Sequence, residues 1–159
     1  MEKDNKNRRI TFEELIDSLV REEIVFPYDR YNIVGDTAEI DKVINTCGII
    51  NIEVDDVYST LSEDTVNYVS VGYGEGMDNM ADVLKNAVGL LPIDVDEVSG
   101  MIFNVWIPED VKASSIRGRN LLSDYVRGLP EDINTIWGIA RDESLASPQI
   151  KVTLIAASR

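Results

Sequence analysis

The sequence predicts an α/β (α+β) fold in which a four-stranded mixed sheet packs against helices. An N-terminal helical extension precedes this domain in the chain. Three observations predict this fold class. Helix and strand patterns alternate from residue 54 onward, which indicates crossover connections between parallel strands. The strand candidates are apolar on both faces, as in a sheet that helices cover on both sides. A short turn precedes the last strand candidate, which predicts a final antiparallel hairpin.

Residues 1–36 form the predicted extension, and residues 37–159 form the predicted domain. Thr11 and Glu14 match a helix capping box, and apolar residues at helical spacing follow, which predicts a helix over 11–22. The rest of the extension is predicted as a short extended segment over 24–26, ended by Pro27, and a loop over 28–35.

The first helix of the domain is predicted to begin at Asp36, a residue suited to the N-cap position. Apolar residues keep helical spacing as far as Cys47, and Gly48 ends the pattern. We therefore expect Cys47 to be a small buried residue of this helix. Further helices are predicted over 54–61, 77–88 and 110–128, and strands over 66–71, 101–107, 135–140 and 150–156.

Composition argues against several classes of function. The net charge of −14 and the pI near 4.3 argue against binding to nucleic acid or to an anionic membrane surface. The sequence has no histidine, which removes the commonest general base and the commonest metal ligand. Its single cysteine permits no internal disulfide and fits a reducing compartment. We expect a cytoplasmic protein with no metal site and no nucleic-acid or membrane partner.

A glycine run, Gly72-Tyr-Gly74-Glu-Gly76, lies between a strand candidate and a helix candidate. Glycine loops at such places can bind phosphate. This run, however, has neither the spacing of the dinucleotide fingerprint nor the Lys-Ser/Thr pair that ends a P-loop. Glu75 and Asp78 would also repel a phosphate. The run is therefore interpreted as a turn.

The segment Gly48–Val57, called the acidic loop below, is the most informative stretch of the chain. It places Glu53, Asp55 and Asp56 at the start of a predicted helix. Carboxylates in that position interact favourably with the helix macrodipole and need no further function. A carboxylate pair can also act as acid and base, and three acids can bind a divalent cation, although the spacing is not that of an EF-hand. From the residues alone, these alternatives stay open.

The acidic loop also resembles a motif of FtsZ, the tubulin-like bacterial division GTPase. FtsZ-type proteins have Gly-x-x-Asn-x-Asp-Phe-Ala-Asp-Val at this place, and this chain reads Gly-Ile-Ile-Asn-Ile-Glu-Val-Asp-Asp-Val without a gap. Further stretches resemble later FtsZ strands, in the family's order and at its separations: 69–76, 134–145 and 150–157. The chain is thus similar to an FtsZ C-terminal domain.

In FtsZ the two acids of this loop reach the nucleotide of the neighbouring filament subunit and help to position the attacking water. The resemblance carries the roles of the two acids to Glu53 and Asp56 and adds Asn51 to the same site. Asn51 and Asp56 match the motif, whereas Glu53 replaces an aspartate and Asp55 replaces an alanine. The glycine-rich loop of the family's GTP-binding domain does not occur in this sequence. The resemblance therefore implies no cofactor bound by the chain alone, and GTP contact only through a partner subunit.

These features lead to one expected function and several alternatives. The chain is expected to dock its acidic loop on an FtsZ-type GTPase, or on a copy of itself, as a regulator of division filaments at the septum. By itself it is not expected to be an enzyme, and at most it contributes acids to GTP hydrolysis in trans. It could instead be a non-catalytic binding or oligomerisation module, an independent small-molecule enzyme, or a fragment of a longer protein.

Overall fold

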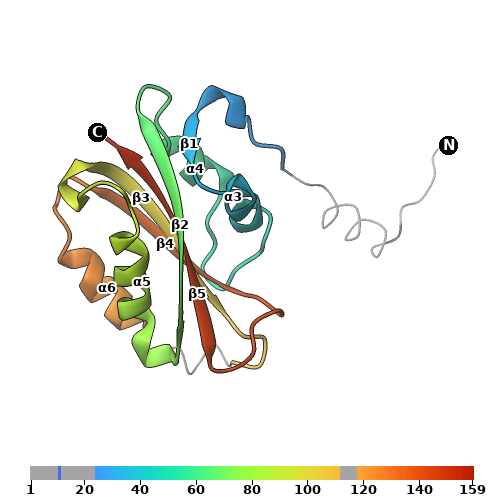
Figure 1. Cartoon of the computed structure of the whole chain (residues 1–159). Coiled ribbons are helices and arrows are strands. Elements are labelled where there is room, and N and C mark those ends of the chain that lie inside the picture. Colours follow the sequence, from blue (N-terminus) through green and yellow to red (C-terminus); the bar gives the residue numbers. More distant parts are fainter. Residues whose placement is uncertain (1–10, 12–23, 112–117) are drawn as a thin grey trace.

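A computed structural model describes residue 11 and residues 24–111 and 118–159 of the chain (Figure 1). The elements are η1 (Tyr28–Arg30), β1 (Asn32–Val34), α3 (Thr37–Ile44), α4 (Val54–Thr60), β2 (Val66–Glu75), η2 (Met77–Asn79), α5 (Met80–Gly89), η3 (Val95–Glu97), β3 (Val98–Ile107), α6 (Gly118–Arg127), β4 (Asn134–Arg141) and β5 (Gln149–Ser158). The predicted helix over 11–22 and the first part of the helix over 110–128 lie outside the described residues. Segment 24–26 was predicted to be extended, and no strand is assigned there.

A single mixed sheet forms the centre of the molecule, with the strand order β1-β2-β5-β3-β4. β1 is parallel to β2, and β3 is parallel to β4, whereas β5 is antiparallel to both of its neighbours, β2 and β3. The α/β fold class is therefore as predicted, but the sheet has five strands rather than four. The additional strand, β1, lies within the segment 28–35 that was predicted to be a loop. Its three residues are too few to show a strand periodicity.

The predicted connection between the last two strands was wrong. β4 and β5 are consecutive in the sequence but are not paired, because β3 lies between them. In the same way β5 separates β2 from β3, which were predicted to be parallel neighbours. The final strand crosses the end of the sheet and enters its centre, where Val152, Leu154 and Ile155 are fully buried. An apolar strand of this kind is typical of a central position.

Helices cover both faces of the sheet (Figure 1). One face packs against α5 and α6 around Phe103, Val105 and Leu154. The opposite face packs against α3 and α4 around Ile102, Trp106 and Ile155, which belong to the same strands, β3 and β5. Because adjacent residues of a strand point to opposite faces, a strand that is apolar throughout serves both cores.

The helix α3 begins as predicted and ends early. The Asp36 side chain accepts a hydrogen bond from the Ala38 N–H (2.9 Å) and caps the first turn. The helix ends at Ile44, where the Asn45 side chain donates to the Asp41 carbonyl (3.0 Å) and accepts from the Ile24 N–H (2.8 Å). Cys47 therefore lies beyond the helix and is exposed, contrary to the prediction that it is buried.

The glycine run is for the most part strand rather than turn. β2 continues to Glu75, and only Gly76, with φ of +90°, has a backbone conformation that side chains disfavour. A Cβ atom on Gly72 would lie 2.8 Å from the Val83 carbonyl oxygen, and one on Gly74 would lie 2.4 Å from the Val83 side chain. The two glycines thus allow α5 to approach β2 closely, a role that their spacing did not reveal.

Candidate functional site

The acidic loop connects α3 to α4 and is fixed to the edge strand β4 by backbone hydrogen bonds. The N–H groups of Ile49 and Ile50 donate to the Ile139 carbonyl (2.7 and 3.1 Å), and the Ile139 N–H donates to the Ile50 carbonyl (3.0 Å). This isolated bridge covers part of the otherwise open edge of β4. The start of the loop is therefore held by the sheet itself.

Two glycines make this close approach sterically feasible. A Cβ atom on Gly138 would lie 2.6 Å from the Ile50 carbonyl oxygen and 2.9 Å from the Ile52 side chain. A Cβ atom on Gly48 would lie 2.6 Å from the Ile139 carbonyl oxygen. Real Cβ atoms essentially never come so close to another atom, so any side chain at either position would push the loop away from β4.

Apolar anchors hold the second half of the loop and leave its polar side chains outside. Ile52 is 4% exposed and Val57 is fully buried, both in the core on the α3 and α4 side of the sheet. Asn51, Glu53 and Asp55 alternate with these anchors and are exposed. The loop thus presents an amide and two carboxylates to the outside from a backbone that is fixed at both ends.

Asp56 is half-buried and has a structural role. One of its carboxylate oxygens accepts a hydrogen bond from the Glu53 N–H (2.8 Å), as in a capping box at the start of α4. The backbone carbonyl of Asp56 accepts from the hydroxyls of Ser59 and Thr60 (2.9 and 2.8 Å). Asn51 also stabilises the turn, because its side-chain oxygen accepts from the Gly48 N–H.

The three predicted site residues, Asn51, Glu53 and Asp56, therefore lie together on one short loop. Carboxylates there can accept hydrogen bonds from a water or attract a cation that a partner holds. Among residues 11, 24–111 and 118–159, no group of three or more His, Cys, Asp or Glu side chains is arranged to hold a metal ion.

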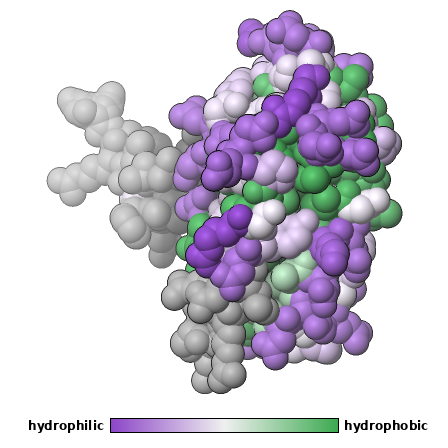
Figure 2. All heavy atoms as spheres, turned by 90° about the vertical axis from the view of Figure 1, so that its left-hand side faces the viewer, coloured by the Kyte–Doolittle hydropathy of each residue, from purple (hydrophilic) through white to green (hydrophobic). Residues whose placement is uncertain are grey.

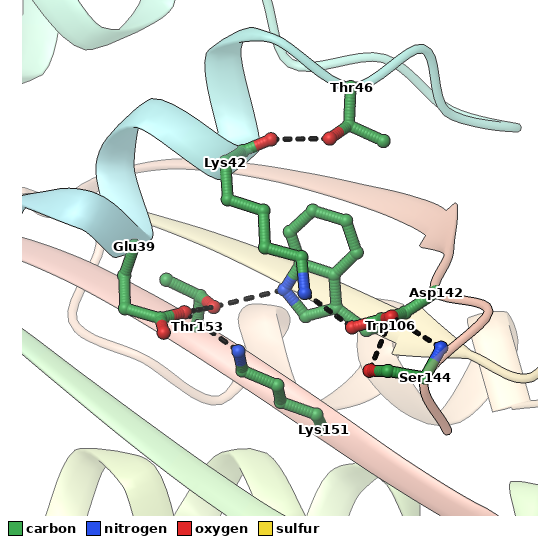
Figure 3. A network of polar contacts seen from close by, with 8 residues as sticks. All are labelled: Glu39, Lys42, Thr46, Trp106, Asp142, Ser144, Lys151 and Thr153. Carbon is green, nitrogen blue, oxygen red and sulfur yellow. Dashed lines mark hydrogen bonds and ion pairs between the residues drawn. The ribbon is translucent and has the colours of Figure 1, made fainter. Parts of the chain in front are cut away.

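A polar network that the sequence analysis missed lies under α3, the helix that precedes the acidic loop in the chain (Figure 3). Lys151 of β5 forms an ion pair with Glu39 of α3 (2.8 Å), and the Lys151 side chain is only 7% exposed. Thr153 donates to Glu39 (3.1 Å) and accepts from the Trp106 indole N–H (2.9 Å). Every partner of the buried ammonium and indole groups thus comes from α3 or from the centre of the sheet.

A second ion pair joins α3 to the turn between β4 and β5. Lys42 contacts the Asp142 carboxylate, and its ammonium also lies 4.7 Å from the centre of the Trp106 ring. Ser144 donates to Asp142 through its N–H (2.9 Å) and its hydroxyl (2.7 Å). Burial alone would raise the pKa of Asp142, but the hydrogen bonds from Lys42 and Ser144 outweigh it and lower this pKa to about 2.

The network fixes the helix from which the acidic loop emerges. One sequence signal could have indicated it, because Lys151 and Thr153 are polar residues two apart in an otherwise apolar strand and so share a face. Their shared partner Glu39 lies more than a hundred residues away in the sequence, and Lys42 and its partner Asp142 are a hundred residues apart. No local pattern identifies such a pairing.

The chain is similar to parts of two cell division proteins. No protein-family model matches it. It is 26% identical over 121 residues to the cell division protein FtsZ of Porphyromonas gingivalis. The aligned residues cover 74% of this chain and 26% of that protein. It is 23% identical over 116 residues to the cell division protein FtsZ 1 of Methanocaldococcus jannaschii. That alignment covers 72% of this chain and 31% of the relative.

Solved structures give the same result for the fold. A mutant FtsZ from M. jannaschii superposes with a TM-score of 0.58 at 21% identity, over 76% of this chain and 36% of that one. TubZ from Bacillus thuringiensis serovar israelensis, in GDP-form protofilaments, gives a TM-score of 0.51 at 10% identity, over 70% of this chain and 31% of that one. This chain therefore has an FtsZ/tubulin-like α/β fold and resembles a part of FtsZ. It spans only about a third or less of the length of these relatives.

No helix in the described parts of the chain is long and apolar enough to cross a membrane.

Proposed function

We propose that this FtsZ-like chain acts in cell division by docking its acidic loop on the nucleotide face of an FtsZ-type GTPase. One observation supports the proposal most directly. The loop that matches the FtsZ motif is fixed to β4 and exposes Asn51 and Glu53, with Asp56 half-buried beside them. A preformed, outward-facing loop costs little ordering entropy when it binds.

The 159 residues of the chain include the acidic loop and no GTP-binding glycine loop. FtsZ-type filaments grow by head-to-tail contacts, which need two different faces on each subunit. A molecule that offers only the loop face would occupy the end of a filament and present no nucleotide face to the next subunit. The proposed outcome is capping of filaments, with stimulation of one round of GTP hydrolysis in trans.

The proposal is tested by adding the purified chain to a polymerising FtsZ from the same cell. Sedimented polymer and GTP turnover are measured against the dose of the chain. We expect the polymer to decrease at doses well below the FtsZ concentration, because one chain blocks one filament end. If neither quantity changes with dose, the docking proposal is wrong.

A matched pair of variants assigns the effect to the loop. Asp56→Asn removes the charge and keeps an oxygen that can accept from the Glu53 N–H, so the turn should be retained. Glu63→Gln removes one charge from an exposed residue outside the loop. We expect Asp56→Asn to abolish the effect on GTP turnover and Glu63→Gln to leave it unchanged.

A second function is favoured by the hydrogen bonds within the loop. Asp56 and Asn51 both have structural partners in the turn, and these contacts alone would explain why the two residues are present. In that case the domain would be a non-catalytic binding or oligomerisation module of FtsZ-like fold. The same pair of variants separates the two functions, because a module would act on its partner equally well with Asp56→Asn.

A further inference from the structure

The outer edge of β2 is open over much of its length. On one side β2 pairs with β5 from Asn67 to Glu75. On the other side β1 pairs only with the first part of β2, from Val66 to Tyr68. In the described part of the chain, no strand pairs with residues 69–75 on that side. An open edge of this length is a template for another strand.

The pairing with β5 shows which backbone groups point outward. The Gly76 N–H donates to the Pro148 carbonyl (2.8 Å), so the hydrogen-bonded pairs of this antiparallel ladder fall on the even-numbered residues of β2. The N–H and C=O groups of Val71 and Tyr73 therefore point away from β5, toward the open side. The Glu75 carbonyl accepts from the Asn79 side chain (2.7 Å), which closes the far end of the edge.

A groove runs beside this edge, between β2 and α5. It is lined by Val71, Gly72 and Tyr73 of β2 and by Asp82, Lys85, Asn86, Gly89 and Leu90 at α5. Tyr73 is 58% exposed and Leu90 is 64% exposed, and nothing lies within 4 Å of the place where a Cβ on Gly89 would be. The side of the molecule that carries α5 and α6 shows exposed hydrophobic residues bordered by hydrophilic ones (Figure 2). The groove thus has apolar contact surface and room for the side chains of an added strand.

Charge around the groove favours a basic occupant. Asp82 and Lys85 are the charged residues that line it. Two further acids, Glu75 at the end of β2 and Asp78 in η2, lie on the connection from β2 to α5 and are exposed, so acids outnumber bases around the groove. The whole chain has a net charge of −14, which opposes the approach of a second copy. We propose that the open edge of β2 binds an extended basic peptide segment of another protein as an added strand. This proposal does not depend on the acidic loop or on a nucleotide.

The strand ladder supplies the affinity and the carboxylates supply the selectivity. An added strand would exchange hydrogen bonds with Val71 and Tyr73, while every second side chain would face α5. Lysine or arginine at those positions would meet Asp82. Gly72 and Gly74 face α5, so the side chains of Val71 and Tyr73 lie on the other face of the sheet, where the apolar residues of an alternating peptide would contact them.

The test uses a synthetic peptide of alternating lysine and valine, compared with a peptide of alternating glutamate and valine. Binding to the full chain is followed by NMR amide shifts and hydrogen exchange at physiological ionic strength. We expect the basic peptide to bind at least about tenfold more tightly, with the Val71 and Tyr73 amides shifted and newly protected from exchange. Equal binding of the two peptides, or shifts confined to other elements, would overturn the proposal.

Two variants and a control locate the binding. Val71→Pro removes an outward N–H, a change that an edge strand tolerates, and should weaken binding about tenfold. Asp82→Lys should also weaken it, whereas Asp96→Lys makes the same change in net charge at an exposed residue outside the groove. If Asp82→Lys and Asp96→Lys weaken binding equally, only net charge is recognised and the proposal fails. A dimer of the free chain that Val71→Pro abolishes would also contradict it, because the occupant would then be a second copy.

Discussion

At the scale of single residues, Asp56 has a structural role in the turn, and the proposed function gives its charge a second one. One carboxylate oxygen accepts the Glu53 N–H and caps α4. The negative charge is what the resemblance to FtsZ assigns to catalysis in a neighbour. A substitution that separates hydrogen bonding from charge can therefore separate stability from function.

Asp56→Ala should lower the free energy of unfolding by about 0.5–2 kcal/mol, because the Glu53 N–H loses its side-chain partner at the helix start. Asp56→Asn should lose less, since its amide oxygen can still accept. Urea denaturation of the two variants and the unaltered chain measures the difference. Equal losses in both variants would mean that the capping bond contributes nothing.

Asp142 should make stability depend on pH under acidic conditions. Its pKa is lowered from 3.8 to about 2 in the folded chain, so its contribution is fully present above the unfolded value and is lost as the pH falls through the folded value. The amount lost between about pH 5 and pH 2 should be about 2 kcal/mol.

The measurement is urea denaturation of the unaltered chain and Asp142→Asn at several pH values. The difference in unfolding free energy between them should be constant above about pH 5 and shrink toward pH 2. Other carboxylates titrate in both proteins and largely cancel in this difference. A difference that does not change with pH would show that Lys42 and Ser144 do not hold Asp142 in its charged form.

Sequence could identify the residues of the acidic loop but not those of the polar network under α3. Asn51, Glu53 and Asp56 are close together in the chain, so one motif contains all three. Lys42 and Asp142 are a hundred residues apart, and only the crossing of α3 over the sheet brings them into contact. Their role can be inferred from the folded structure but not from the sequence alone.

At the scale of elements, the acidic loop depends on its contact with β4. Gly138→Ala would place a Cβ 2.6 Å from the Ile50 carbonyl oxygen, so the loop must shift or the bridge to Ile139 must open. We expect a loss of about 1–3 kcal/mol in unfolding free energy. Hydrogen exchange at the Ile49 and Ile50 amides should become faster.

Gly89→Ala is the matched control for that variant. Nothing lies within 4 Å of the added methyl group, and Gly89 is the last residue of α5, so stability should stay equal or rise slightly. If Gly138→Ala is as stable as Gly89→Ala and the loop amides exchange at an unchanged rate, the loop is not fixed by β4.

The elements themselves were largely predictable because their signals are local. Apolar spacing located α4 and β3, and the residues of Asp36–Glu39 located the start of α3. The pairing of strands was not predictable in the same way. A short connection before β5 suggested a hairpin, but the strand is apolar on both faces and is most stable in the centre of the sheet, between β2 and β3.

At the scale of the whole molecule, the described chain combines the acidic loop, which is fixed to β4, with the open edge of β2. The acidic loop lies against β4 at one edge of the sheet, and the groove beside β2 lies at the opposite edge. A partner at one edge would therefore leave the other accessible. Capping of a filament and binding of a basic peptide should be independent, and each can be measured in the presence of the other.

The most direct test of the central claim is the length distribution of FtsZ filaments seen by electron microscopy at increasing doses of the chain. Capping predicts that the mean length falls steadily while the chain is still far scarcer than FtsZ, and that the control variant Glu63→Gln shortens the filaments as the unaltered chain does. Filaments of unchanged length, or filaments covered along their sides by the chain, would contradict it.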